Sequence, residues 1–334
     1  FDLSIDKNFK FVDYKASGLI KKVNAKITSD SIIKNISFNF IADKSLTLIN
    51  SINANYEGVL VSNGSIDLQR EKGIEIKDKI NSFIDNKDDA LSKLFTKIKF
   101  FKKNKIEVKG SMLHVFNLKI NNNYQIIDYN YKSSGNISQS QIVLKNNFKT
   151  KYIKRSVKKI LFEKIKLEVV FNKQNKNLLL LDGFYTLGNS NYKKFKVKYN
   201  LNKKNQNYFI NLDLNENIFF DFINYKTNPK KNSNIKIEYS VKNKKFIFKL
   251  IDFTEDKNTI SIKDLILNNK SEVEKFSSIK ILTFNKNQEN NNFIINFGKK
   301  ISISGKKYDS SNLLKLLSKP SKSNVLKRFN KEIE

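Results

Sequence analysis

FIINFGKKISISGKKYDSSNLLKLL, residues 293 to 317, is the stretch of sequence that decides the fold. Phe293, Ile295 and Phe297 occupy alternate positions in it, and Ile301 and Ile303 repeat the alternation. Successive side chains of a β-strand point to opposite faces, so residues two apart share a face. The stretch therefore predicts two strands that each have one apolar face.

The second half of this stretch changes character after Gly305, which ends the alternation. Asp309 and Ser310 precede a leucine-rich segment, and the short side chain of either can accept a hydrogen bond from a free N–H group at the start of a helix. Leu313 and Leu314 begin the apolar side of that helix. We therefore expect a short terminal helix over residues 309–318.

The same alternation recurs along much of the chain, with Lys, Asn, Glu and Asp between the apolar positions. Strands follow one another at roughly ten to fifteen residues, which indicates antiparallel hairpins and not strand–helix–strand units. Asn- and Lys-rich turns such as Lys242-Asn243-Lys244 stand where other sheets use Gly and Pro. The pattern predicts an all-β, mainly antiparallel fold. Its alternating apolar series includes Ile36, Phe38, Phe40, Phe195, Val197, Ile235, Ile237, Phe246, Phe248 and Leu250.

Two glycine-containing segments and one change of period complete the predicted organisation. Ser62-Asn63-Gly64 is predicted to be a hairpin turn, because Asn and Gly both accept positive φ, and residues 133–136 are interpreted in the same way. Residues 77–99 carry apolar side chains at three- and four-residue spacing, which predicts a helical insert. Such an insert covers one face of a sheet or, alternatively, binds a membrane surface.

Composition excludes some functions and leaves others open. The chain has 334 residues, 39% hydrophobic and 12% aromatic, which excludes general disorder. Its net charge of +31 comes almost wholly from lysine, which lacks the bidentate geometry that arginine offers to bases and phosphates. We therefore rank nucleic acid third among our hypotheses for the partner, whereas weak attraction to anionic headgroups accounts for the charge better.

Catalytic and metal-binding patterns are missing from the sequence. Cysteine is absent, and His114 is the single histidine, within a strand-like run. A nucleophilic triad or a metal site needs partners for this histidine, and no motif supplies them. We interpret His114 as a packed or surface strand residue, and we expect a non-enzymatic protein without metal or cofactor.

A sheet this long must hide its apolar face. It can close as a barrel, pack as a sandwich, or curl into an open groove, a β-taco. We predict that residues 1–334 form one elongated groove segment of a larger protein, with one or two short helical inserts. The apolar series above, together with Phe293, Ile295 and Phe297, would line a groove for acyl chains. The alternative is a structural or adhesive scaffold whose faces pack into a closed core.

Two short motifs resemble a known family. Gly305-Lys306-Lys307-Tyr308-Asp309 with Leu313-Leu314 resembles the C-terminal signature of AsmA-like proteins, in particular the YhdP type related to TamB. The segments Tyr56-Glu57-Gly58-Val59 and 62–66 are similar to that family's strand–turn–strand repeats.

The resemblance implies a bridge-like lipid-transfer protein of the Gram-negative envelope. Such a protein is anchored at the inner membrane, lies on the periplasmic side and moves phospholipid toward the outer membrane, whose integrity it supports. The implied partners are phospholipid acyl chains, the inner membrane through an anchor outside this segment, and outer-membrane components. The family has no catalytic residues to carry over, and its N-terminal anchor is not part of this chain.

Overall fold

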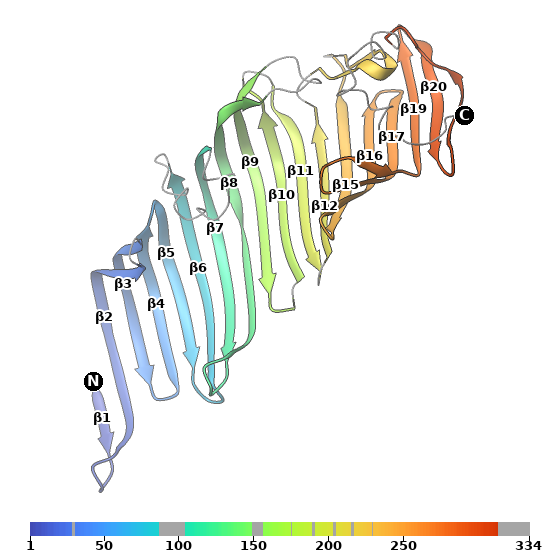
Figure 1. Cartoon of the computed structure of the whole chain (residues 1–334). Coiled ribbons are helices and arrows are strands. Elements are labelled where there is room, and N and C mark those ends of the chain that lie inside the picture. Colours follow the sequence, from blue (N-terminus) through green and yellow to red (C-terminus); the bar gives the residue numbers. More distant parts are fainter. Residues whose placement is uncertain are drawn as a thin grey trace. The chain divides into compact units, whose positions relative to one another are not determined.

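The computed structural model describes residues 1–28, 31–86, 104–148, 156–174, 176–188, 191–202, 205–214, 217–228 and 230–312. Within these residues 19 strands form one antiparallel sheet that is not closed, and β13 pairs with β14 separately (Figure 1). A single turn of 3-10 helix, η1, is the helical element of this described part. The prediction of a mainly antiparallel all-β fold is confirmed.

The chain divides into two compact units. The first unit spans Phe1–Lys145 and Lys159–Phe184, and the second spans Asn146–Lys158 and Tyr185–Glu334. The first contains all or most of β1 Asp2–Ile5, β2 Phe11–Thr28, β3 Ser31–Asp43, β4 Leu46–Tyr56, β5 Val59–Gln69, β6 Ile74–Asn86, β7 Lys105–Ile120, β8 Ile126–Phe148, β9 Val157–Asn172 and β10 Lys176–Thr186. The second contains β11 Lys193–Asn202, β12 Asn205–Asp213, β13 Phe219–Phe220, η1 Asp221–Ile223, β14 Tyr225–Lys226, β15 Ser233–Lys242, β16 Lys245–Glu255, β17 Asn258–Leu267, β18 Val273–Lys275, β19 Ser278–Asn285, β20 Gln288–Phe297 and β21 Ile301–Lys307.

Tight hairpins join β4 to β5 and β15 to β16, and in Figure 1 β2 to β7 lie side by side in chain order. Glu57 and Gly58 connect β4 to β5 with φ of 48° and 81°. Asn243 and Lys244, which join β15 to β16, also both have positive φ, 51° and 62°. Two successive positive φ values match the right-handed twist of the flanking strands. The predicted Asn/Lys turn at 242–244 is confirmed.

The expected helical insert is wrong over residues 77–86, which belong to β6. This strand pairs with both β5 and β7, and its even-numbered side chains are buried or half-buried while most odd-numbered ones are exposed. Ile80 and Ile84 fit a period of two as well as a helical period, and Phe83 lies on the exposed side. Tertiary pairing decided between the two periods. Residues 87–99 of the predicted insert lie outside the described residues.

Both glycine segments predicted as turns lie within strands. Asn63 has a φ of 50°, but Gly64 does not have positive φ, so the pair lacks the conformation of a two-residue turn and forms a bulge in β5. Residues 133–136 run through the middle of β8. A Cβ atom on Gly135 would stand 2.1 Å from the carbonyl oxygen of Ser111 in β7. This glycine allows two backbones to approach each other, and it does not reverse the chain.

The second unit has a closed core at one end of its sheet. Ile223 of η1 and Tyr225 of β14 pack on Phe253, Ile260 and other buried residues of the sheet, so the segment 218–228 covers this part of the face. Side chains in this core are between 2% and 9% exposed. Burial of that extent is typical of a packed protein interior.

A buried carboxylate fixes one side of the covering segment. Glu255 is 2% exposed and accepts hydrogen bonds from the backbone N–H of Asn228 (2.8 Å), the hydroxyl of Ser233 (2.7 Å) and the hydroxyl of Tyr225. A buried charge is costly unless it is hydrogen-bonded, and these three donors satisfy it. Burial and the bond to Glu255 raise the pKa of Tyr225, so this phenol remains a donor.

Candidate functional site

The first unit presents one continuous apolar face, which is the candidate site. Residues directly opposite each other in an antiparallel pair point to the same side of the sheet, so the register shows which side chains share a face. From β3 to β8 this face collects half-buried and buried side chains that are almost all apolar. We call it the apolar face, and its members include Ile36, Phe38, Phe40, Ile49, Ile52, Ala54, Val61, Ile66, Leu68, Ile76, Ile80, Ile84, Met112, Phe116, Leu118, Tyr129, Tyr131 and Ile137.

The opposite side of the same strands, the polar face, carries mostly Lys, Asn, Asp, Glu and Ser. Several large apolar side chains that lie there are more exposed: Ile41 is 60% exposed, Leu60 46% and Val115 42%. Ion pairs also lie on this face, for example Lys109 with Asp85 at 3.3 Å. The two faces of one sheet therefore differ both in chemistry and in exposure.

The apolar face includes very few fully buried side chains. In the described part of the first unit, the apolar side chains below 9% exposure are Ile106, Ile137 and Ile165. The second unit, by contrast, has the closed core around Phe253. A unit of this size ordinarily buries a core of its own. The first unit instead leaves most of its apolar surface only half-covered.

Hydrogen-bonding side chains from β6, β7 and β8 meet within the apolar face. His114 lies opposite Ile80 in β6 and Ser133 in β8, and its Nε2 atom is 2.7 Å from the hydroxyl of Ser82. Its Nδ1 atom is 2.8 Å from the hydroxyl of Tyr131 and 3.1 Å from that of Ser133. Every nitrogen of the imidazole is thus engaged. We call these four residues the His114 cluster.

Burial lowers the pKa of His114, so the neutral ring is favoured in the folded protein. The groups at Nδ1 are hydroxyls, and these cannot stabilise an imidazolium as the carboxylate of a catalytic triad does. The residues that the structure describes contain no group of three or more His, Asp or Glu side chains able to hold a metal ion. The arrangement is suited to hydrogen bonding with a polar group on the apolar face.

A row of β-bulges crosses β2 to β5. Lys22, Asn35, Ser51 and Asn63 all have φ between 50° and 56°, one in each strand, and the register shifts beside each of them. A bulge adds one residue and bends its strand. The four bulges lie next to one another in neighbouring strands, so the alternation shifts by one residue in each strand near the same place. Apolar side chains therefore stay on the same face before and after the bulges.

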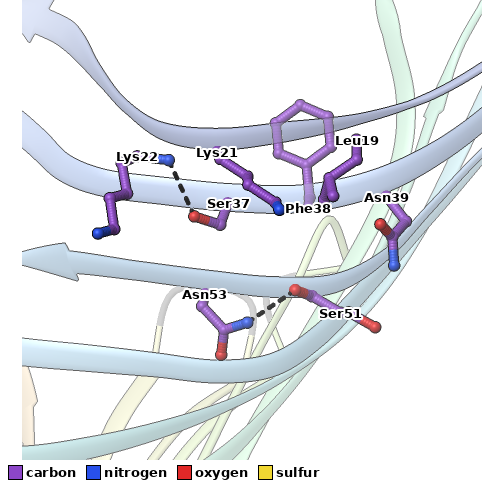
Figure 2. Close-up of a pocket in the computed structure, with 8 residues that line it drawn as sticks. All are labelled: Leu19, Lys21, Lys22, Ser37, Phe38, Asn39, Ser51 and Asn53. Atoms are coloured by element: carbon purple, nitrogen blue, oxygen red, sulfur yellow. Dashed lines mark hydrogen bonds between the residues drawn. The ribbon is translucent and has the colours of Figure 1, made fainter.

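A pocket of about 280 Å³ opens at this row of bulges (Figure 2). Ser37 accepts a hydrogen bond from the backbone N–H of Lys22 (3.0 Å), and Asn53 donates one to the carbonyl oxygen of Ser51 (2.9 Å). Most of its other lining side chains, such as Asn39, belong to the polar face. Ligand pockets are usually larger than this one, so the apolar face remains the stronger candidate.

The structure brings most of the predicted groove residues onto one face within each unit. Ile36, Phe38 and Phe40 share the apolar face of the first unit, where the rings of Phe38 and Phe40 are 6.4 Å apart. In the second unit, β11 pairs with β12, β12 with β15 and β15 with β16. This pairing places the predicted groove residues of β11 and β15 on one face. These are Phe195, Val197, Ile235 and Ile237.

Leu250 does not share a face with Phe246 and Phe248, because a bulge separates it from them. Leu250 lies opposite Glu238, whereas Phe248 lies opposite the next residue, Tyr239, so the two side chains point to opposite faces. Phe246 and Phe248 keep the predicted face and extend a row of stacked rings, with Tyr239 5.3 Å from Phe248. Strict alternation in the sequence cannot reveal an inserted residue.

The predicted residues of β20 divide between core and half-buried positions. Phe293 is 6% exposed and belongs to the closed core, so it packs under the covering segment and does not line an open surface. Ile295 and Phe297 continue on the same face and are half-buried.

The C-terminal motif fastens the covering segment from its other side. Gly305 lies within β21 opposite Phe293, where a Cβ atom would come within 2.4 Å of the Phe293 side chain. Asp309 accepts hydrogen bonds from the side chain of Asn224 (3.1 Å) and from the backbone N–H of Ser311 (3.1 Å). The hydrogen bond from the Ser311 hydroxyl, followed by those from the Ser311 N–H and the Asn224 side chain, lowers the pKa of Asp309. Residues 313–318 of the expected terminal helix, with Leu313 and Leu314, lie outside the described residues.

Comparisons with protein-family models, characterised proteins and solved structures give no match to this chain. No helix in the described part of the chain is long and apolar enough to cross a membrane. The geometry of the two units therefore carries the functional inference.

The sequence alone did not identify the hydroxyl side chains of the apolar face that bond to His114. Ser82 fell in the segment expected to be helical, and Ser133 fell in a predicted turn. His114 was assigned to a strand, but its hydroxyl partners could not be found without the register. Alternation would have placed Ser82 on the same face as Ile80 if residues 77–86 had been interpreted as a strand.

Proposed function

We propose that this chain is a non-enzymatic phospholipid-transfer segment that holds acyl chains on the apolar face of its first unit. In this proposal it acts on the periplasmic side of a Gram-negative envelope, anchored at the inner membrane through a part of the protein outside this segment. It moves lipid between the inner and outer membranes and so supports outer-membrane integrity. The resemblance of residues 305–309 to AsmA-like proteins supports the choice of compartment.

One observation carries the proposal: the apolar face is continuous over six strands and only half-covered. Contiguous exposed apolar surface on a soluble domain usually marks a site for a partner, a ligand or a membrane. Most side chains of this face are Ile, Leu, Val or Phe, and these offer acyl chains apolar contact. Acyl chains would cover what the protein itself leaves uncovered.

The difference in exposure between the faces supports a curved sheet. Ile36 and Phe38 are half-buried, whereas Ile41, in the same strand but on the polar face, is 60% exposed. Side chains crowd together on the concave side of a bent sheet and spread apart on the convex side. The row of bulges at Lys22, Asn35, Ser51 and Asn63 provides a cause for bending. A groove open on the apolar side accounts for both observations.

A second candidate function rests on the second unit. The core around Phe253 and Ile260 is closed by residues 218–228, as expected of a structural or adhesive scaffold. If the first unit also closes, through contacts with another part of the protein, the whole chain is a scaffold. The two functions differ in whether lipid occupies the apolar face.

Lipid content of the purified protein separates the two candidates. We expect native mass spectrometry to show phospholipid bound to the folded chain. Ile80→Asn, on the apolar face of β6, should lower the amount bound severalfold, whereas Phe83→Asn, on the polar face of the same strand, should leave it unchanged. A folded, lipid-free protein that takes up no phospholipid would favour the scaffold.

A further inference from the structure

Among the described residues of β3 to β8, a single carboxylate lies on the apolar face. Asp78 of β6 is directly opposite Ile66 in β5 and Phe116 in β7, and both neighbours belong to that face. The other acidic residues of β6, Glu75 and Asp85, lie on the polar face and pair with lysines there. Asp78 forms no ion pair among the described residues, although Lys and Arg number 63 in the chain.

Aromatic rings form a row that begins beside this carboxylate and continues across β7, β8 and β9. Phe116 is in register with Asp78 on one side and with Tyr131 on the other, and the rings of Phe116 and Tyr131 are 6.5 Å apart. Phe171 of β9 stacks on Tyr131 with ring centres 6.3 Å apart, and its side chain is 44% exposed. The combination of one anionic group and several ring faces is typical of sites for organic cations, because ring faces attract positive charge.

The surroundings favour a cation supplied from outside the chain. Burial raises the pKa of Asp78, while its interaction with the backbone N–H of Phe116 opposes this rise only in part. Burial, and to a lesser extent the charge of Asp78, raises the pKa of the nearby Tyr131. A carboxylate desolvated in this way gains from a positively charged partner more than an exposed one does.

We propose that Asp78, with the rings of Phe116 and Tyr131, binds the ammonium group of a lipid headgroup. The inference rests on the proposed function and adds selectivity to it: lipids with an ethanolamine headgroup are preferred over anionic lipids that lack a cation. The hydroxyls and imidazole of the adjacent His114 cluster lie next to this position and suit the polar remainder of a headgroup. The acyl chains extend over the apolar residues on either side.

A binding comparison tests this selectivity. The purified chain is titrated calorimetrically with a short-chain phosphatidylethanolamine and with phosphatidylglycerol of the same acyl chains, both below their micelle concentrations. We expect the ethanolamine lipid to bind roughly tenfold more tightly, as is usual for one charge-assisted hydrogen bond. Asp78→Asn should abolish the preference by weakening only the ethanolamine lipid. Asp85→Asn, on the polar face of the same strand, should preserve it.

Each other outcome has a defined meaning. Equal binding of both lipids by the unmodified chain overturns the headgroup site but leaves acyl-chain binding standing. Binding of neither lipid overturns the proposed function as well. If Asp78→Asn weakens both lipids equally, or if it leaves the preference intact, the carboxylate does not select the headgroup. The preference of the unmodified chain remains a test even if the variant folds poorly.

Discussion

Asn291 donates a hydrogen bond from its side-chain nitrogen to the backbone carbonyl oxygen of Ile223, over 2.9 Å and 68 residues of sequence. The same side chain donates to the hydroxyl of Thr283 (2.9 Å) and accepts from the backbone N–H of Asp309 (2.9 Å). Asn291 is fully buried, so these are three bonds in a dry environment. One asparagine thus connects β20, the covering segment and the C-terminal motif.

Replacing this asparagine should loosen the closed core of the second unit. We expect Asn291→Ala to lower the free energy of unfolding by about 2–4 kcal/mol, because it leaves buried backbone groups without partners. Asn296→Ala, at an exposed position of the same strand, is the control and should change stability by less than about 0.5 kcal/mol. Chemical denaturation measures both. Similar small effects for the two variants would show that Asn291 does not hold the segment.

Because Asn63 lies in the row of bulges, we expect glycine to be tolerated better than valine at this position. Asn63 has a φ of 50°, a region that Gly and Asn accept and that β-branched residues avoid. Asn63→Val should therefore destabilise the protein by about 1–2 kcal/mol, whereas Asn63→Gly should be nearly neutral. In an ordinary strand position valine would be preferred over glycine. Thermal melts that rank valine above glycine would contradict the bulge.

The His114 cluster predicts a stability that depends on pH. Burial lowers the pKa of His114 in the folded state, so below the ordinary pKa of about 6.5 the unfolded chain binds more protons than the folded one. Stability should then be complete above about pH 6.5 and fall as the pH drops toward the lowered value. The measurement is the free energy of unfolding between pH 5 and 8.

The control for this dependence is simple, because His114 is the only histidine in the chain. His114→Gln should flatten the slope between pH 5 and 7. Asp78 acts in the opposite direction: burial raises its pKa, so its protonation on acidification favours the folded state. A slope of equal size in the glutamine variant would show that another group is responsible.

Fold class could be predicted from the sequence because alternation of apolar residues is a local property. Phe293, Ile295 and Phe297 show the pattern, and β20 contains all three. Positive φ at residue 63 was also predictable from the residue type. The role of the Asn63-Gly64 pair could not be predicted, because Asn-Gly occurs both in hairpin turns and in bulges. Only the pairing of β5 with β4 and β6 decides between the two.

The composition of the candidate site depended on long-range register. A single inserted residue at the β16 bulge moved Leu250 to the opposite face from Phe248. Phe293 alternates as regularly as Phe38, yet it is buried because residues 218–228, distant in sequence, cover it. The function of the Tyr308-Asp309 motif likewise became visible only through its contacts with Phe222 and Asn224.

Lipid contact at the apolar face is the central claim, and site-specific photo-crosslinking in the cell envelope tests it most directly. A photoreactive phenylalanine derivative is placed at Phe38, on the apolar face of β3, or at Ile41, on the polar face of the same strand. Phospholipid captured from residue 38, with little from residue 41, is the predicted result. Equal capture from both positions, or capture from residue 41 alone, would contradict it.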